Sequence, residues 1–198
     1  MNRLPLLATL LVAGCIQYGS IQTAATNGKG RFEGGVEAGV RVVPGDDDDN
    51  TSILTNNTLS LRYGITDRVD LGLRVGQNAY DVHGKVMFTK ADAPVIVSFA
   101  PSFFSDDFGN MAFNTPVLLG IPLGPHELTL GPRVVTATDQ ALLGLNNGER
   151  MVFGSSLGFA AQILPGFKLL PEITMVAGAK GSFAQDIKLG FLFGGRRR

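Results

Sequence analysis

Apolar and polar residues alternate along most of the chain after residue 30. In residues 31–42 every even-numbered position is apolar or glycine, whereas the odd-numbered positions include Arg31, Glu33, Glu37 and Arg41. Successive side chains of a β-strand point to opposite faces. This segment is therefore predicted to form one strand with an apolar face and a charged face.

The same alternation recurs in nine further segments, and no charged residue falls on the apolar face of any of them. The 3.6-residue period of a helix is absent, and 26 glycines suit frequent turns between strands. The chain is predicted to be all-β, forming a single antiparallel up-and-down β-barrel of ten strands, with eight or twelve strands as alternatives. The further segments are 59–65, 69–75, 82–88, 95–99, 117–121, 128–134, 153–163, 173–175 and 187–193.

Alternation of this kind occurs in soluble barrels with an apolar interior and in membrane barrels whose apolar residues face lipid. The charged face also carries glycines such as Gly35, Gly72 and Gly131, which suit a crowded interior better than a surface in water. Its charges balance, as a packed polar interior requires. We therefore predict a membrane-embedded barrel with a charged lumen. The predicted lumen residues are Arg31, Glu33, Glu37, Arg41, Arg62, Asp70, Arg74, Asp81, His83, Lys85, Glu127, Arg133, Glu172, Asp186 and Lys188.

The connections between the predicted strands alternate in length. Outer-membrane barrels have short periplasmic turns and long external loops, and an even number of strands returns both termini to the periplasm. The chain follows this pattern except at residues 76–79, where an expected external loop is brief. Short turns at 66–68, 90–93, 123–127 and 164–167 alternate with mostly longer connections at 44–57, 100–112, 136–150 and 178–182.

The first fifteen residues have the form of an export signal. An apolar run from Leu4 to Val12 follows Arg3, and it is too short for a spanning helix of roughly 20 residues. Val12-Ala13-Gly14-Cys15 resembles the lipobox of bacterial lipoproteins, which implies cleavage before Cys15, the only cysteine, and its acylation. The alternative is a free thiol after an ordinary signal peptide. Lipoproteins kept at the inner membrane often carry aspartate where Ile16 stands, so delivery to the outer membrane is expected.

These features divide the chain into four predicted parts. Residues 1–14 form a lipoprotein signal peptide, 15–30 a flexible tether from the lipidated cysteine, 31–193 the barrel, and 194–198 a basic tail. The tether prediction rests on its Gly, Ser, Thr, Asn and Gln content without periodicity. Removing the first 14 of 198 residues leaves 184, enough for one domain.

The overall charge excludes one class of partner. Seventeen basic residues balance seventeen acidic ones, so no basic face exists to attract nucleic acid. The glycines match neither phosphate-binding fingerprint, and no cofactor is predicted.

Two segments resemble bacterial outer-membrane β-barrel proteins as a class. Residues 63–73 look like their strand, tight turn and strand hairpin, and residues 188–193 are similar to their terminal strand signal. The resemblance implies outer-membrane lipid, the barrel-insertion machinery and the lipoprotein-sorting machinery as partners. The chain departs from the class in its three arginines at 196–198 and in having only Tyr63 and Tyr80 as girdle tyrosines in the barrel.

Two groups of residues suggest chemistry, and each has a simpler explanation. Asp46, Asp47, Asp48 and Asp49 offer oxygen ligands for calcium but lack EF-hand spacing, so a solvated acidic loop is the favoured interpretation. His83 lies two residues from Asp81 and could act as a general base. Its predicted inward direction favours a structural role, and no catalytic residue is predicted.

The predicted function is a lipid-anchored outer-membrane barrel with a largely filled polar lumen, acting as a structural protein or binding an extracellular ligand through its long loops. Three alternatives stay open: a narrow channel, a soluble lipid-tethered barrel that holds a small apolar ligand inside, and an outer-membrane lipid-modifying enzyme.

Overall fold

The computed structural model describes residues 21–44, 51–76, 79–107, 109–139, 143 and 149–195. Strands dominate these ranges, as the alternating sequence predicts. The strands are β1 Phe32–Val43, β2 Ser52–Gly64, β3 Val69–Gly76, β4 Ala79–Met87, β5 Ile96–Phe99, β6 Ser102–Asp106, β7 Met111–Leu123, β8 His126–Ala137, β9 Met151–Leu164, β10 Phe167–Gly178 and β11 Phe183–Gly194.

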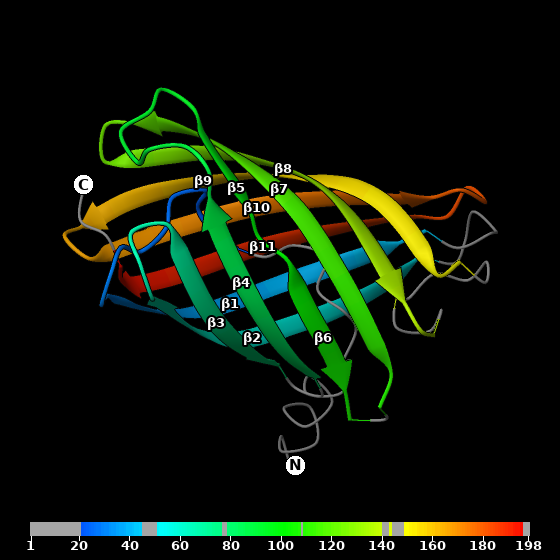
Figure 1. The fold of residues 1–198 in the computed structure, drawn as a ribbon. Helices are drawn as coiled ribbons and strands as arrows, with labels where there is room; N and C mark the ends of the chain where they lie inside the picture. Colours follow the sequence, from blue (N-terminus) through cyan, green and yellow to red (C-terminus); the bar gives the residue numbers. More distant parts are fainter. Residues whose placement is uncertain are drawn as a thin grey trace, which may run out of the picture.

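The strands close into one antiparallel barrel (Figure 1). Chain neighbours pair around the sheet, and β1 pairs with β11 to complete the ring. β5 and β6 both pair with β4 and β7, and Val86 opposite Phe99 continues in the same register to His83 opposite Ser102. They are therefore two halves of one barrel strand, separated at Pro101, which has no backbone N–H to donate. The predicted all-β, ten-strand, up-and-down barrel is confirmed.

Side-chain direction distinguishes the two barrel architectures. Charged residues of the alternating strands are buried inside, whereas 34 large hydrophobic residues are exposed on the outer surface. At mid-height, Leu130, Leu157, Ile173, Ile187 and Val40 are register partners on successive strands. A continuous apolar band of this extent is typical of a barrel surrounded by lipid. The alternative of a soluble barrel with an apolar interior is wrong.

The two ends of the barrel differ. We call the end that holds the start of β1, the end of β11 and residues 65–68, 124–125 and 165–166 the turn end, and the opposite end the loop end. Two predicted connections, 44–57 and 100–112, were too long. β2 begins within the first at Ser52, because it pairs with β1 up to Val43, and residues 102–106 of the second form β6. Adjacent apolar residues, Ile53-Leu54 and Phe103-Phe104, conceal the alternation in these segments.

Phenylalanine provides most of the aromatic residues at both rims. At the turn end, the rings of Phe32 and Tyr63 contact each other at a tilt with centroids 4.6 Å apart, and the ring centroids of Phe167 and Phe193 lie 5.1 Å apart. The loop end has its own exposed aromatics on five strands: Tyr80, Phe103, Phe113, Phe153 and Phe183. Aromatic girdles at two levels mark the interfaces of a membrane barrel. Among the described residues, no helix has the length and apolarity needed to cross a membrane.

Candidate functional site in the barrel lumen

The middle of the lumen holds charged side chains that pair across neighbouring strands. Arg41 on β1 is the direct register partner of Asp186 on β11. Its Nε donates to Asp186 Oδ1 at 2.7 Å and its Nη2 to Oδ2 at 3.0 Å, and both side chains are fully buried. A bidentate arginine–carboxylate pair is among the stronger polar contacts available to a protein interior. This ion pair links β1 and β11, the first and last strands, whose pairing closes the barrel.

A second ion-paired group joins β3, β4 and β1. Arg74 Nη2 donates to its register partner Asp81 at 2.6 Å, and Arg74 Nη1 lies 4.0 Å from Glu37. His83 Nδ1 lies 3.0 Å from Asp81 Oδ1, and the His83 ring occupies the space that a side chain at Gly72 would fill. Asp81 therefore holds both a guanidinium and an imidazole inside the lumen.

The structure does not assemble a catalytic group around His83. Ser156 accepts a hydrogen bond from Arg133, and Ser155 faces the outer side of β9. His126 lies at the turn end, where its Nδ1 accepts from the Gln162 amide at 3.2 Å and its ring stacks on Phe159. Both described histidines thus have structural partners. Ser102 lies opposite His83 on β6, but no hydrogen bond joins these two side chains in the part of the chain that the structure describes.

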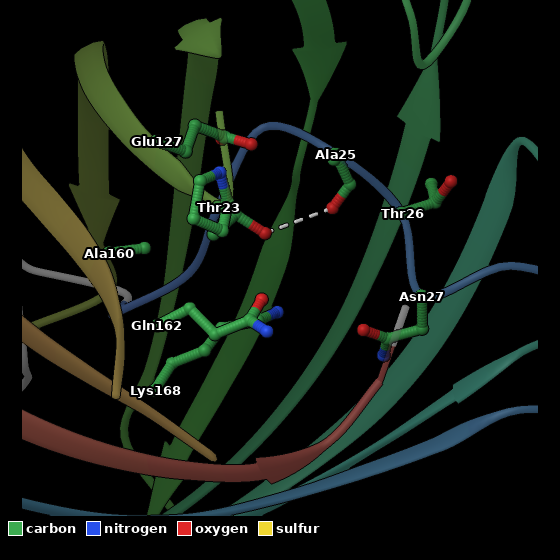
Figure 2. A pocket seen from close by; sticks show the side chains of 9 residues that line it. Thr23, Ala25, Thr26, Asn27, Glu127, Ala160, Gln162 and Lys168 are labelled. Atoms are coloured by element: carbon green, nitrogen blue, oxygen red, sulfur yellow. Dashed lines mark hydrogen bonds between the residues drawn. The ribbon is translucent and has the colours of Figure 1, made fainter. Parts of the chain in front are cut away.

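At the turn end, residues 21–28 lie inside the barrel in no regular strand, and we call them the lumen segment (Figure 2). All eight residues are buried. The segment crosses from Asp70 on β3, whose carboxylate accepts from Asn27 N, past Glu127 on β8 to Gly190 on β11, against which Ile21 packs. This corrects the prediction of a flexible tether for its described part, whereas residues 15–20 lie outside the described residues. In residues 21–28, small polar residues without periodicity therefore belong to a segment that side chains of the strands hold in place.

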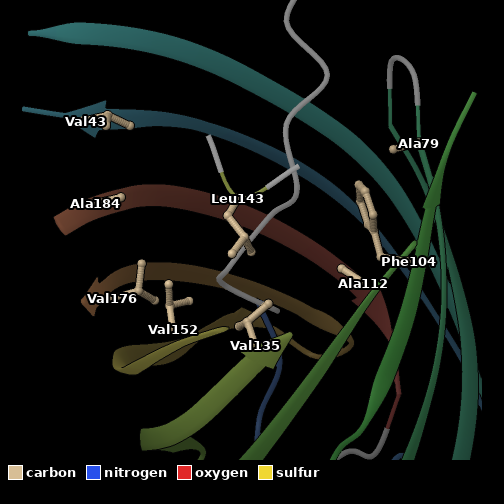
Figure 3. Packing of buried hydrophobic residues seen from close by; sticks show 9 residues of the cluster. All are labelled: Val43, Ala79, Phe104, Ala112, Val135, Leu143, Val152, Val176 and Ala184. Carbon is tan, nitrogen blue, oxygen red and sulfur yellow. The ribbon is translucent and has the colours of Figure 1, made fainter. Parts of the chain in front are cut away.

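Apolar side chains occupy the lumen at the loop end. Leu143, which belongs to the connection between β8 and β9, is fully buried among them (Figure 3). Glu149, from the same connection, accepts a hydrogen bond from the Lys180 backbone beyond β10. Buried apolar side chains therefore pack together inside this end of the barrel. The cluster consists of Val43, Ala79, Phe104, Ala112, Val135, Leu143, Val152, Val176 and Ala184.

The structure places all but one of the fifteen predicted lumen residues inside. Arg31 is the exception, because it precedes β1 and is exposed at the turn end. Asp46, Asp47, Asp48, Asp49 and Cys15 lie outside the described residues. The fourteen buried residues are Glu33, Glu37, Arg41, Arg62, Asp70, Arg74, Asp81, His83, Lys85, Glu127, Arg133, Glu172, Asp186 and Lys188.

Sequence reasoning missed several polar residues of the lumen, and Lys168 and Ser98 show the reasons. Lys168 lies 3.1 Å from Glu33, which also pairs with Arg62 at 2.6 Å. Lys168 shares the parity of Glu172 and could have been found, had the predicted strand been extended to its true start at Phe167. Ser98 carries no charge to mark its face, yet it donates to the lumen segment.

Comparison with known proteins adds the fold class. No protein-family model and no curated protein matches the sequence. Among solved structures, an outer membrane channel from Pseudomonas putida F1 is 11% identical with a TM-score of 0.51, over 92% of this chain and 99% of that one. The attachment invasion locus protein of Yersinia pestis, Ail, is 10% identical with a TM-score of 0.38, over 84% and 99%.

A third similar structure is the N-terminal β-barrel domain of Pseudomonas aeruginosa OprF, which is 14% identical with a TM-score of 0.37, over 84% of this chain and 99% of that one. Likeness at these identities concerns the fold, and the likeness to the outer membrane channel, with its TM-score of 0.51, agrees with the exposed apolar band. The chain has the fold of bacterial outer-membrane β-barrel proteins.

Proposed function

We propose that this protein is an integral outer-membrane β-barrel, anchored by lipid at Cys15, whose lumen is closed to ions and whose external loops carry its binding or structural role. Three groups of buried residues inside the barrel support the proposed closure. Apolar side chains pack around Leu143 at one end, ion pairs lie in the middle, and the lumen segment crosses the other end.

Closure by paired charges suits a barrel of this size. Ten strands give an interior slightly wider than the filled eight-stranded case and far narrower than a sixteen-stranded porin. Arg41 and Asp186 are held by two hydrogen bonds, and Arg74 and Asp81 by one at 2.6 Å. Ions crossing the lumen would have to pass these paired side chains.

The geometry is compatible with the proposed lipid anchor. Ile21 packs against Gly190, four residues before the end of β11 at Gly194, which is about 13 Å of strand. The six residue steps from Ile21 back to Cys15 span at most about 20 Å. Cys15 could thus reach the leaflet at the turn end, which corresponds to the periplasmic side in this class.

The loop end is the proposed site of external binding. Its two longest connections join β1 to β2 and β8 to β9, and both lie at the same end of the barrel. Binding residues concentrate on loops held by a rigid scaffold. We propose no catalytic role, because His83 is enclosed with Asp81 and lies far from the lipid-facing surface.

Planar-bilayer recording tests the proposed closure. The mature chain, reconstituted and shown to be folded by its altered gel migration before heating, is expected to give no conductance steps above the lipid background in concentrated KCl. Steps of uniform size that scale with salt concentration would show a narrow channel and overturn the closed-lumen proposal.

A further inference from the structure

The lumen segment is bound mainly through its backbone. Lys85 Nζ donates to the carbonyl oxygens of Thr23 at 3.1 Å and of Ala25 at 2.7 Å. Ser98 donates to the Ala24 carbonyl at 2.5 Å. Each of these donors is a buried side chain of a barrel strand. Three successive carbonyl groups of a stretch that bends at Ala24 and Ala25 therefore have a donor from the barrel wall.

Acidic side chains bind the amide groups of the same stretch. Asn27 N donates to both carboxylate oxygens of Asp70, at 3.1 and 3.0 Å, and Ala24 N donates to Glu127. Carboxylates bound by backbone N–H groups make charge-assisted hydrogen bonds, which are stronger than neutral ones. The barrel wall thus binds carbonyl groups of the segment through a lysine and its N–H groups through carboxylates.

The sequence placed Lys85, Asp70 and Glu127 in the lumen only as members of a balanced set of charges. Lys85 does lie 3.4 Å from Asp70, but an ammonium has three donors and two of them bind carbonyl groups of the segment. Withdrawal of the segment would leave buried charged groups without these partners, which is costly in a protein interior. These side chains form a binding site for a polypeptide backbone, with their donors and acceptors already in position.

Small residues of the barrel wall set the size of the occupant. A side chain at Gly120 would lie only 2.7 Å from Ala24 Cβ, and one at Gly190 would lie 2.4 Å from Ile21 Cγ2. The segment therefore fits because glycine lies opposite it at both points. Next to it, a cavity of about 20 Å³ lined by Thr23, Asn27 and Lys168 leaves room for about one water molecule. A larger residue at position 24 has no space.

We propose that the turn end of the lumen is a binding site for a short, bent peptide of small residues, and that the lumen segment is its ligand within the same chain. When the segment is released, a separate peptide of this kind binds in its place through the same backbone contacts. This site exists whether or not the barrel conducts ions.

The first test locks the segment in the Cys15→Ser chain, which has no other cysteine. Ile21 Cβ lies 3.5 Å from the position of a Cβ at residue 190, within the Cβ separation of a disulfide. The double variant Ile21→Cys/Gly190→Cys is expected to form the disulfide in the folded, full-length barrel. The single variant Gly190→Cys should keep its thiol free. Two free thiols in the folded double variant would overturn the placement of the segment.

The second test measures binding of a fluorescent peptide with the sequence of residues 20–28. The release variant, Ala24→Pro/Asn27→Pro in the full chain, lacks both N–H donors to Glu127 and Asp70. It is expected to bind the peptide at least tenfold more tightly than the unchanged chain, whereas the oxidised double-cysteine variant should not bind it. The matched control peptide carries proline at the position of Ala24 and should bind at least tenfold more weakly.

Equal binding to the locked and release variants, or no binding to the release variant, would contradict the proposal. If the release variant does not fold, the double-cysteine variant supplies the comparison alone, with a peptide of residues 22–28, which lacks Ile21 and so avoids the new side chain at position 190. Its reduced form is expected to bind this peptide and its oxidised form to exclude it, and equal binding by both forms would overturn the proposal.

Discussion

Replacing Arg41 with methionine is expected to lower the free energy of unfolding by about 3–5 kcal/mol, the usual cost of breaking a buried ion pair on one side. The guanidinium makes two hydrogen bonds to Asp186, and both side chains are fully buried between β1 and β11. Methionine fills similar volume but leaves the carboxylate without these donors. Equilibrium unfolding by guanidinium chloride in lipid vesicles measures the change.

The double variant Arg41→Met/Asp186→Asn provides the control. Removing both charges avoids an uncompensated carboxylate in the lumen, so this variant should be more stable than Arg41→Met alone. If the costs of the two single changes simply add in the double variant, the pair does not act as a buried ion pair, and the account of the lumen is wrong.

The second large effect is expected on the outer surface. Ile187 lies at mid-height on β11 between its register partners Val40 and Ile173, and it is 47% exposed. Ile187→Arg should destabilise the barrel in a bilayer by about 2–4 kcal/mol, because it places a charge at the hydrocarbon midplane. The same unfolding experiment in vesicles measures this difference.

Leu123 offers a matched control at another depth. It ends β7 at the turn end and is similarly exposed, at 49%. Leu123→Arg is expected to cost only about 0–1 kcal/mol, since arginine near the interface reaches water. Near-equal effects of the two substitutions would mean that the outer surface has no depth-dependent contact with lipid.

The alternating sequence predicted the barrel, its strand number and the direction of nearly every charged side chain, because the period of a strand is two and one face excludes charge. Prediction was weaker where a segment becomes a strand because it pairs with a neighbouring strand, although its own sequence does not alternate. β2 begins at Ser52 because β1 continues to Val43, and Phe103-Phe104 places one ring on each face of β6. Neither feature has an alternating signal.

The binding role of the lumen charges was beyond sequence reasoning. The charge balance suggested that the lumen neutralises itself, yet Lys85, Asp70 and Glu127 also bind backbone groups of the lumen segment. Backbone carbonyl and N–H groups are present in every residue and leave no mark in the sequence. The composition of residues 21–28 indicated a flexible linker, because small polar residues suit both a solvated tether and a narrow site.

The central claim, that the apolar surface contacts lipid, is open to a direct measurement because the chain contains no tryptophan. In a Leu157→Trp variant the single indole would lie at mid-height on β9, between Leu130 and Ile173. In vesicles of phospholipids brominated near the ends of their acyl chains, its fluorescence is expected to be strongly quenched. Unquenched fluorescence from a folded barrel that stays monomeric in buffer without lipid would contradict the account.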